Sequence, residues 1–417
     1  MAFNIQNKAL QSHIQSLLYF WRGNGYAGPL KKNELFKVSE SLVKLQRGLT
    51  GERTLAGTAD GSYMQDNAML GAYLLYYWPV TFMQVQYGAM SIQNKIDALI
   101  KKEGKTIKIL DLGSGPGPAG AALCDVIQRK LGDKSKKPVE LTLVDYSSKA
   151  LGMAKKMFAR DFSNVSVNTI VSNFEKGSLA LEEGDFDIII TSHCINELWN
   201  GNTDCLEKRV NFIKKACEYL CKDGIIFINE PALLLTSRNL LALRNSLIKD
   251  GFKVIAPCSC NMECSVLQNG PNQTCHALVE WTPVQMVADI AKSAKLDRTS
   301  VKMTYFVFEK QDTERKIESD NCTEKKEKES ELIISGTVVS DGMLNKAGRV
   351  RFVICSNGNR ITVSAKQDDD MASIKGFFSL KRYDRVTITE PEIRGDKNNV
   401  SYGIKDSTVI KIDRFVK

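Results

Sequence analysis

The chain has 417 residues, 43% hydrophobic and 25% charged, which is the composition of a folded globular protein. This length exceeds one ordinary core and predicts two or three domains. The net charge of +9 permits a polyanionic partner such as RNA without requiring one. The sequence has no apolar run long enough to span a membrane and no export signal at its start, so we expect a reducing compartment and a monomer without membrane contact.

The predicted elements divide the chain into four parts. Residues 1–100 show helical periodicity, as in "LFKVSESLVKLQRGL". Residues 101–310 alternate short apolar runs with amphipathic stretches, a pattern typical of a parallel α/β sheet covered on both faces. The seven predicted strands are 107–112, 139–145, 165–171, 185–192, 224–230, 252–256 and 302–310.

The last part of the chain is predicted to be a separate small domain. Residues 311–331 carry charges of both signs and almost no apolar residues, which predicts a solvated linker or a polar helix. Residues 332–417 alternate in strand fashion, and "CSNGNR" contains the Asn-Gly pair of tight hairpins. We expect an all-β, OB-like domain there. Its basic residues make it a candidate RNA surface: Arg349, Arg351, Arg360, Lys366, Lys381, Arg382 and Arg385.

A glycine-rich loop follows the first predicted strand in "ILDLGSGPGPAGAAL" (109–123). Glycines let such a loop turn sharply and bring backbone N–H groups close to a ligand. Two templates fit, the dinucleotide fingerprint G-x-G-x-x-G and the acidic-x-G-x-G-x-G loop of methyltransferases that bind S-adenosylmethionine. The second fits better because an acidic residue stands at the strand end. An ordinary tight turn is the alternative. The candidate cofactor residues are Asp111, Gly113, Gly115, Gly117, Asp145, Asn173 and Ser192.

The methyl acceptor of such an enzyme would lie after the fourth strand, in "TSHCINELW" (191–199). This stretch lacks the Asp/Asn-Pro-Pro-Tyr signature of amino-directed nucleobase methyltransferases. His193 and Glu197 fit a base and a binding residue, or equally a packed strand-end residue and a helix-start carboxylate. The catalytic residues therefore stay unassigned, and the sequence supports cofactor binding more strongly than catalysis.

Four cysteines fall in the short stretch 256–276: Cys258, Cys260, Cys264 and Cys275. Thiolates spaced this way in a loop can converge on a soft metal centre. If three come from the loop, the candidates for a fourth ligand are Cys260, His276, Cys322 and Cys355. Zinc and an iron–sulfur cluster both remain open, as do reduced thiols without metal.

Several stretches resemble a known family, the methyltransferase-like proteins of the small ribosomal subunit of mitochondria and bacteria. The resemblance covers roughly residues 60–310 and rests on "AYLLYYWPVTFMQVQ", "TSHCINELW", "INEPALLLTSRNLLALR", "VIAPCSCNMECSV", "CHALVEW" and "KMTYFVFEK". It implies a seven-stranded Rossmann-like class I methyltransferase domain. It also implies a four-iron four-sulfur cluster, with zinc as the alternative, on Cys258, Cys264, Cys275 and Cys355.

The resemblance further implies a partner, the small ribosomal subunit and its rRNA. We therefore expect an S-adenosylmethionine-binding protein that methylates rRNA, assists subunit assembly, or does both. The alternatives are a non-catalytic RNA-binding assembly factor and a zinc-containing small-molecule methyltransferase. The expected compartment is the cytoplasm, with mitochondria as the alternative.

Overall fold

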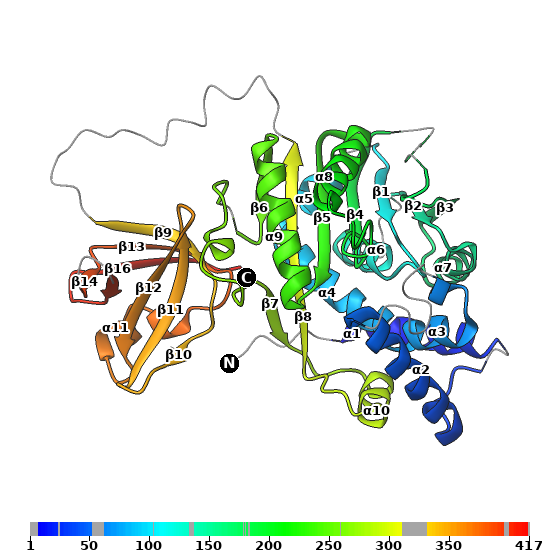
Figure 1. The fold of residues 1–417 in the computed structure, drawn as a ribbon, viewed down its shortest axis with the longest axis horizontal. Helices are drawn as coiled ribbons and strands as arrows, with labels where there is room; N and C mark the ends of the chain where they lie inside the picture. The colour runs from blue at the N-terminus through cyan, green and yellow to red at the C-terminus, as the bar shows by residue number, and fades with distance from the viewer. Residues whose placement is uncertain are drawn as a thin grey trace. The chain divides into compact units, whose positions relative to one another are not determined.

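The computed structural model describes residues 7–23, 26–51, 62–102, 104–132, 137–177, 179, 181, 184–258, 260–310, 332–395 and 400–415. Within these residues no helix is long and apolar enough to cross a membrane. The chain forms two compact units (Figure 1). The first comprises Met1–Leu240 and His276–Tyr305, and the second comprises Leu241–Cys275 and Phe306–Lys417. The predicted linker 311–331 lies outside the described residues.

Helices precede and separate the strands of the first sheet. They are α1 (Lys8–Arg22), α2 (Lys32–Thr50), α3 (Asn67–Ala72), α4 (Trp78–Met90), α5 (Gln93–Lys101), α6 (Pro118–Leu131), α7 (Ser148–Asp161), α8 (Cys205–Ala216), α9 (Leu234–Lys249) and α10 (Gln285–Ser293). A π-helical stretch, Tyr73–Tyr77, joins α3 to α4. The predicted N-terminal helical segment is confirmed.

The first sheet has the strand order β3-β2-β1-β4-β5-β8-β6, with β7 paired to β8. Its strands are β1 (Ile107–Leu112), β2 (Val139–Asp145), β3 (Val165–Val171), β4 (Phe186–Ser192), β5 (Leu220–Pro231), β6 (Phe252–Ala256), β7 (Ala277–Glu280) and β8 (Ser300–Lys310). The predicted Rossmann-like seven-stranded domain is confirmed. The sheet is mixed, because β6 and β7 each pair antiparallel with β8.

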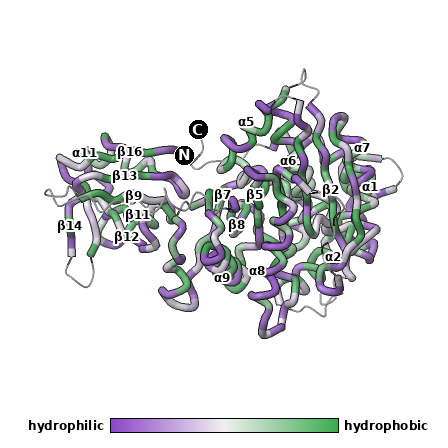
Figure 2. The backbone as a smooth tube through the Cα atoms, turned by 90° about the horizontal axis from the view of Figure 1, so that it is seen from above, coloured by the Kyte–Doolittle hydropathy of each residue, from purple (hydrophilic) through white to green (hydrophobic). Residues whose placement is uncertain are grey.

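Burial explains why the central strands read as continuous apolar runs. Every residue of β4 is buried, as are five of the six residues of β1. Strands covered on both faces have no solvated side, so the polar alternation of a half-exposed strand disappears. Figure 2 shows hydrophobic residues along the strands of this sheet and mixed hydropathy along its helices.

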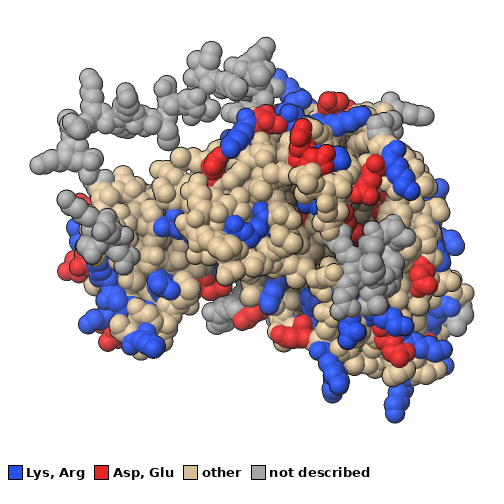
Figure 3. Space-filling view, viewed as in Figure 1, with Lys and Arg blue, Asp and Glu red and all other residues tan. Residues whose placement is uncertain are grey.

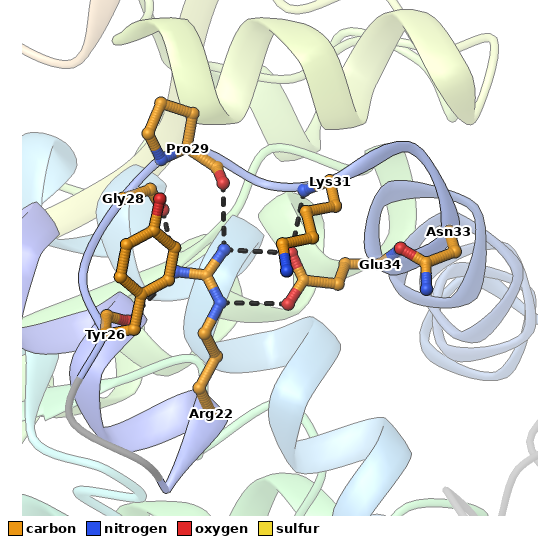
Figure 4. A network of polar contacts seen from close by, with 7 residues as sticks. All are labelled: Arg22, Tyr26, Gly28, Pro29, Lys31, Asn33 and Glu34. Atoms are coloured by element: carbon orange, nitrogen blue, oxygen red, sulfur yellow. Dashed lines mark hydrogen bonds and ion pairs between the residues drawn. The ribbon is translucent and has the colours of Figure 1, made fainter.

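An arginine at the end of α1 fixes the turn into α2 (Figure 4). Arg22 Nε and Nη2 each donate to a carboxylate oxygen of Glu34 at 2.9 Å. The same guanidinium donates to the carbonyls of Tyr26, Gly28 and Pro29 at 3.0, 2.7 and 2.9 Å. The hydrogen bond from Arg22 lowers the pKa of Glu34 to about 2. A bidentate pair of this kind sets a geometry as well as an energy, so it defines the angle between the two helices.

The second unit contains a largely antiparallel sheet of order β14-β15-β12-β11-β9-β13-β16, with β10 paired to β11. Its elements are β9 (Ile333–Val338), β10 (Met343–Leu344), β11 (Arg349–Ser356), β12 (Asn359–Lys366), the short helix α11 (Asp370–Ile374), β13 (Arg385–Thr389), β14 (Glu392–Arg394), β15 (Ser401–Gly403) and β16 (Val409–Asp413). A core that includes Phe352, Ile354 and Phe377 fills it. The second β domain is thus present, and its OB-like character stays a prediction.

The predicted Asn-Gly hairpin joins β11 to β12. Ser356 pairs with Asn359, so the turn contains only Asn357 and Gly358. Both turn residues have positive φ, +46° and +77°. That is the geometry of the tight turns that match the twist of antiparallel strands, and it places Cys355 one residue before the end of β11.

Candidate functional site

The first candidate site is a pocket in the first unit, at the carboxyl edge of the sheet. Leu112 pairs with Val144 of β2 on one side and with Thr191 of β4 on the other. The loops that follow β1, β2 and β4 therefore leave the sheet at the same level. Ligands of open α/β sheets bind at this edge.

Two glycines of the loop after β1 line this pocket without side chains. Gly113 and Gly115 have φ of +70° and +52°. A Cβ on Gly113 would lie 2.3 Å from Cys194 Sγ, a separation that two such atoms never adopt. The absence of side chains thus lets the backbone approach both the loop after β4 and a ligand.

Asp145 ends β2 and also lines the pocket. Its Oδ2 accepts from the backbone N–H of Gly115 and its Oδ1 from that of Ser147, each at 2.8 Å. Burial raises the pKa of Asp145 to about 6. The backbone N–H of Tyr146 is a third donor to this carboxylate. A carboxylate has about four lone-pair sites, so one remains for a hydroxyl donor of a ligand.

The last two predicted pocket residues come from the ends of β3 and β4. Asn173 lines the pocket while its Oδ1 accepts from the backbone N–H of Glu175 at 2.9 Å. Ser192 lines it as well, and its Oγ accepts from Asn229 Nδ2 at 2.9 Å. The structure therefore brings five of the seven predicted cofactor residues to one pocket.

Asp111 and Gly117 support this pocket and do not line it. Asp111 is fully buried, and its Oδ2 accepts from the N–H of Gly120 in the first turn of α6 at 2.9 Å. Burial raises the pKa of Asp111 to about 7. Gly117 precedes α6 with φ of +76° and packs against Phe158. Both residues fix the start of α6, which sets the path of the glycine loop.

The roof of the pocket comes from the N-terminal helical region, which the sequence did not assign to the site. Tyr63, Met64 and Tyr73 line it, and Tyr73 begins the π-helical stretch between α3 and α4. In the same helix, Trp78 Nε1 donates to the carbonyl of Pro116 in the glycine loop at 3.1 Å. In the sequence this region is visible only as the aromatic run "AYLLYYW". The run contains the π-helical stretch Tyr73–Tyr77, and π-helical turns often occur at functional sites.

These features fit S-adenosylmethionine. The glycines leave a backbone cradle that a Cβ would fill, and the buried carboxylate of Asp145, with one lone pair left, lines the same pocket. A tyrosine-rich wall accommodates flat rings. The same pocket contains His193, Cys194 and Glu197 from the loop after β4.

The second candidate site is the set of thiols in the second unit. Cys258, Cys260, Cys264 and Cys275 follow β6, and Cys355 lies on β11, where it pairs with Arg360 of β12. All five are half-buried. Within this unit the loop and the hairpin are in contact, because a Cβ on Gly358 would lie 3.3 Å from the carbonyl oxygen of Glu263.

The thiols of the loop and of β11 affect one another's pKa. Burial, followed by the thiols of Cys258, Cys260, Cys264 and Cys275, raises the pKa of Cys355 to about 12. Burial, followed by Cys264 and Cys258, raises the pKa of Cys275 to about 11. A cysteine 80 residues along the chain from Cys275 is thus brought to the cysteine loop.

Arg244 of α9 organises the cysteine loop. Its side chain is almost fully buried, and it donates to the carbonyls of Cys260 and Met262, the latter at 2.8 Å. It also donates to Asn245 Oδ1, which accepts from the N–H of Cys264. The guanidinium lies beside Cys258, where it opposes the stronger effect of burial, which raises the pKa of that thiol. Nε of Arg244 is buried and has no hydrogen-bond partner among the described residues.

The described part of the chain has no ready site for a single ion. Among the described residues, no three His, Cys, Asp or Glu side chains are placed to hold one metal ion. Of the alternative ligands, Cys260 lies in the same loop, His276 belongs to the first unit, and Cys322 lies outside the described residues. In a four-iron cluster each thiolate binds a different iron, so the thiolates surround the cluster and do not converge on one point. Five neighbouring thiols and a buried guanidinium with an unused N–H fit such a group.

A glycine loop and an acidic second-strand end in a sheet of this order define a methyltransferase-like protein of the class I fold. A comparison with known protein families identifies one family: residues 68–367 match the family described as "Mitochondrial small ribosomal subunit Rsm22". The match spans most of the chain, and the chain belongs to the Rsm22 family.

Other similarities are more distant or more partial. A stretch of 101 residues is 30% identical to the non-reducing polyketide synthase prhL of Penicillium brasilianum, which is 24% of this chain and only 4% of that protein. A putative class I S-adenosylmethionine-dependent methyltransferase of Listeria monocytogenes is 13% identical, with 74% of this chain and 90% of that chain covered and a TM-score of 0.37. The CcbJ methyltransferase of Streptomyces caelestis is 18% identical, with 34% and 47% covered and a TM-score of 0.23. The chain thus spans less than half of the CcbJ chain.

Proposed function

We propose that this chain binds S-adenosylmethionine in the pocket of the first unit and acts on the small ribosomal subunit. The observation that carries the proposal is the pocket itself, in which Gly113, Gly115 and Asp145 meet in a chain of the Rsm22 family. When bound, this cofactor supplies an electrophilic methyl group. The protein supplies a backbone cradle, a carboxylate for hydroxyl groups and the tyrosine wall formed by Tyr63 and Tyr73.

We further propose that the second unit holds a four-iron four-sulfur cluster on Cys258, Cys264, Cys275 and Cys355. Support comes from the gathering of these thiols and from the buried Nε of Arg244 beside Cys258. The cluster would tie the loop after β6 to β11, and its binding energy would add to the folding free energy. Zinc is the rival, as four thiolates also suit a tetrahedral ion.

The acceptor is proposed to be rRNA of the small subunit. The family name supports this partner and also a mitochondrial location, with the cytoplasm as the alternative. A non-catalytic assembly factor that uses the same pocket as a sensor is the second candidate, favoured by the absence of a recognised acceptor motif after β4. Cell fractionation with a tagged full-length chain separates the two compartments.

Calorimetry and a transfer assay test the proposal. The full chain should bind S-adenosylmethionine with a measurable Kd, and radiolabelled methyl groups should appear in rRNA of isolated small subunits. Binding with no transfer to any small-subunit RNA would favour the assembly factor. No heat of binding at millimolar cofactor would remove the cofactor proposal altogether.

A further inference from the structure

His193, which directly follows β4, occupies an unusual backbone conformation in the pocket. Its φ is +57°, and its backbone N–H donates to the carbonyl of Asn229 at 2.8 Å. Left-handed conformations are uncommon for residues with a Cβ and persist where the surroundings enforce them. Here the strained turn directs the imidazole to the pocket, which His193 lines.

A buried glutamine of α4 determines which ring nitrogen of His193 carries the proton. Gln84 Nε2 donates to the carbonyl of Lys302 at 2.9 Å, so Gln84 Oε1 is the atom that faces His193. His193 Nε2 lies 2.8 Å from this Oε1. An amide oxygen only accepts, and His193 Nε2 must therefore be the donor. Asn229 Nδ2 donates to the same oxygen at 3.3 Å, which agrees with its role as acceptor.

The other ring nitrogen, Nδ1, then keeps its lone pair. Nδ1 has no hydrogen-bond partner among the described residues, yet it is not one of their fully buried polar atoms. It therefore keeps accessible surface, and the ring to which it belongs lines the pocket. Burial, and next the charge of Arg298, lowers the pKa of His193 to about 4, so the imidazole is neutral at pH 7. A neutral imidazole with one fixed proton is an acceptor at its other nitrogen.

Four other titratable groups of the pocket are less suited to accept a proton. Burial raises the pKa of Cys194, Tyr63 and Tyr73, so these groups stay protonated at neutral pH. Asp145 already accepts three backbone N–H groups. The remaining carboxylates of the pocket are Glu175, whose Oε1 accepts from the backbone N–H of Trp199, and Glu197.

We propose that His193 is a catalytic residue whose Nδ1 accepts the proton lost by the methyl acceptor, with Gln84 as its positioning residue. This inference rests on the proposed methyl transfer in the same pocket. The acceptor's electron pair forms a bond to the methyl carbon, the carbon–sulfur bond breaks, and its electron pair stays on sulfur, which becomes neutral. The acceptor's proton moves to His193 Nδ1, and the imidazolium later returns it to water. Charge and atoms balance without another reactant.

The first test is spectroscopic and needs no acceptor. The chain has only 3 histidines, so ¹⁵N-histidine spectra of the full chain can be assigned by difference with His193→Gln. At pH 7 His193 should show a protonated Nε2 and an unprotonated Nδ1. Gln84→Glu should raise the pKa of His193, because a carboxylate stabilises the imidazolium. An Nδ1-protonated ring or an imidazolium at pH 7 would overturn the proposal.

The second test is single-turnover methyl transfer to small subunits. Glutamine at position 193 keeps a side-chain amide near the place of Nε2 and removes the acceptor at Nδ1. His193→Gln should therefore lose about 100-fold or more in rate, within the range for general bases, while the Kd of the cofactor changes less than about twofold. Asparagine tolerates positive φ, but its amide oxygen cannot take up a proton, so His193→Asn should be as slow as His193→Gln and controls for the backbone conformation. A wild-type chain that transfers no methyl would sink the proposed function and this inference with it. Normal rates in His193→Gln would sink only this inference.

Discussion

The two candidate sites are built in different ways. The cofactor pocket is made where parallel strands end, so residues spaced 30 or more positions apart, such as Gly115 and Asp145, meet because of strand order alone. The cysteine site depends on the arrival of β11, whose Cys355 lies 80 residues after Cys275. A pocket formed by the sheet needs no ligand to exist, whereas thiols that repel one another as anions need a cation or protons. We therefore expect the pocket to tolerate loss of metal, and the cysteine site to be sensitive to it.

The largest expected effect is loss of cofactor binding in Gly113→Val. The new side chain would collide with Cys194 and would require a φ of +70°, so binding should become undetectable by calorimetry. Gly152→Ala is the matched control, because Gly152 lies in α7 and a Cβ there meets nothing within 4 Å.

Iron analysis of the same variants tests whether the cofactor pocket and the cysteine site form independently. Gly113→Val should keep as much iron as the wild type if the two sites form independently. A milder variant, Asp145→Asn, should weaken cofactor binding by about tenfold or more, since it removes a charge-assisted acceptor. Joint loss of cofactor binding and iron in Asp145→Asn would mean that the two sites are not separate.

The pocket residues at the strand ends could be predicted from the sequence, because each lies at or just after the end of a recognisable strand. The glycines, Asp145 and Ser192 each follow a strand whose apolar run is readable, and parallel strands end at one edge. The roof could not be predicted, because Tyr63 and Tyr73 lie in helices whose place over the sheet is decided by tertiary packing. Gln84 was missed for the same reason: its buried amide looks like any polar residue on a helix, and only the position of Lys302 reveals its orientation.

The prediction of the cysteine site had two different sources. The spacing of the loop cysteines was visible, but the choice of Cys355 came from a resemblance and not from any local pattern. The antiparallel β6–β8 edge was missed since both strands have the same apolar character as their parallel neighbours. Several predicted RNA-binding arginines turn out to hold the fold: Arg382 pairs with Asp341 at 2.9 Å, and Arg385 donates to the carbonyl of Ile255 at 3.1 Å.

The next prediction concerns the proposed metal ligands. Cys275→Ser and Cys355→Ser should each lose most of the iron of anaerobically purified protein, because an incompletely ligated cluster is labile. Cys260→Ser is the control from the same loop and should keep its iron. Cofactor binding should persist in all three. The measurements are iron, sulfide and zinc analysis with the ultraviolet–visible spectrum.

Two results would change the assignment. About one zinc per chain with no sulfide would replace the cluster by a zinc site. Full iron content in Cys355→Ser together with loss of iron in Cys260→Ser would assign the fourth ligand to Cys260. All four ligands would then lie in the loop, and the cysteine site would no longer depend on β11.

A smaller effect is expected from Arg244→Lys. Lysine keeps the charge but lacks the planar guanidinium fork that reaches the carbonyls of Cys260 and Met262 and the Oδ1 of Asn245 together. We expect it to leave one of these buried acceptors without a donor, which costs about 1–3 kcal/mol. Hydrogen exchange in residues 260–275 should accelerate, and the melting temperature should fall. Lys249→Ala is the control, since Lys249 of α9 also contacts this loop through Glu263, but the pair is largely exposed and contributes about 1 kcal/mol or less. Equal exchange in the two variants would show that Arg244 does not organise the loop.

The smallest expected effects concern RNA binding by the second unit. Figure 3 shows a group of Lys and Arg side chains on the C-terminal strands, at the lower left. Four predicted RNA-binding residues are exposed: Arg351, Lys366, Lys381 and Arg385. Arg385 donates to the carbonyl of Ile255, so the test uses Arg351, Lys366 and Lys381. Each phosphate contact releases counterions, so each alanine substitution at these positions should weaken small-subunit RNA binding by about two- to fivefold. It should also reduce the slope of log affinity against log salt by about one. Lys155→Ala and Lys156→Ala, exposed on α7 of the first unit, are the matched controls. If the two control substitutions weaken RNA binding as much as the three test substitutions do, the RNA-binding surface is not confined to the second unit. The two units would then not differ in RNA binding.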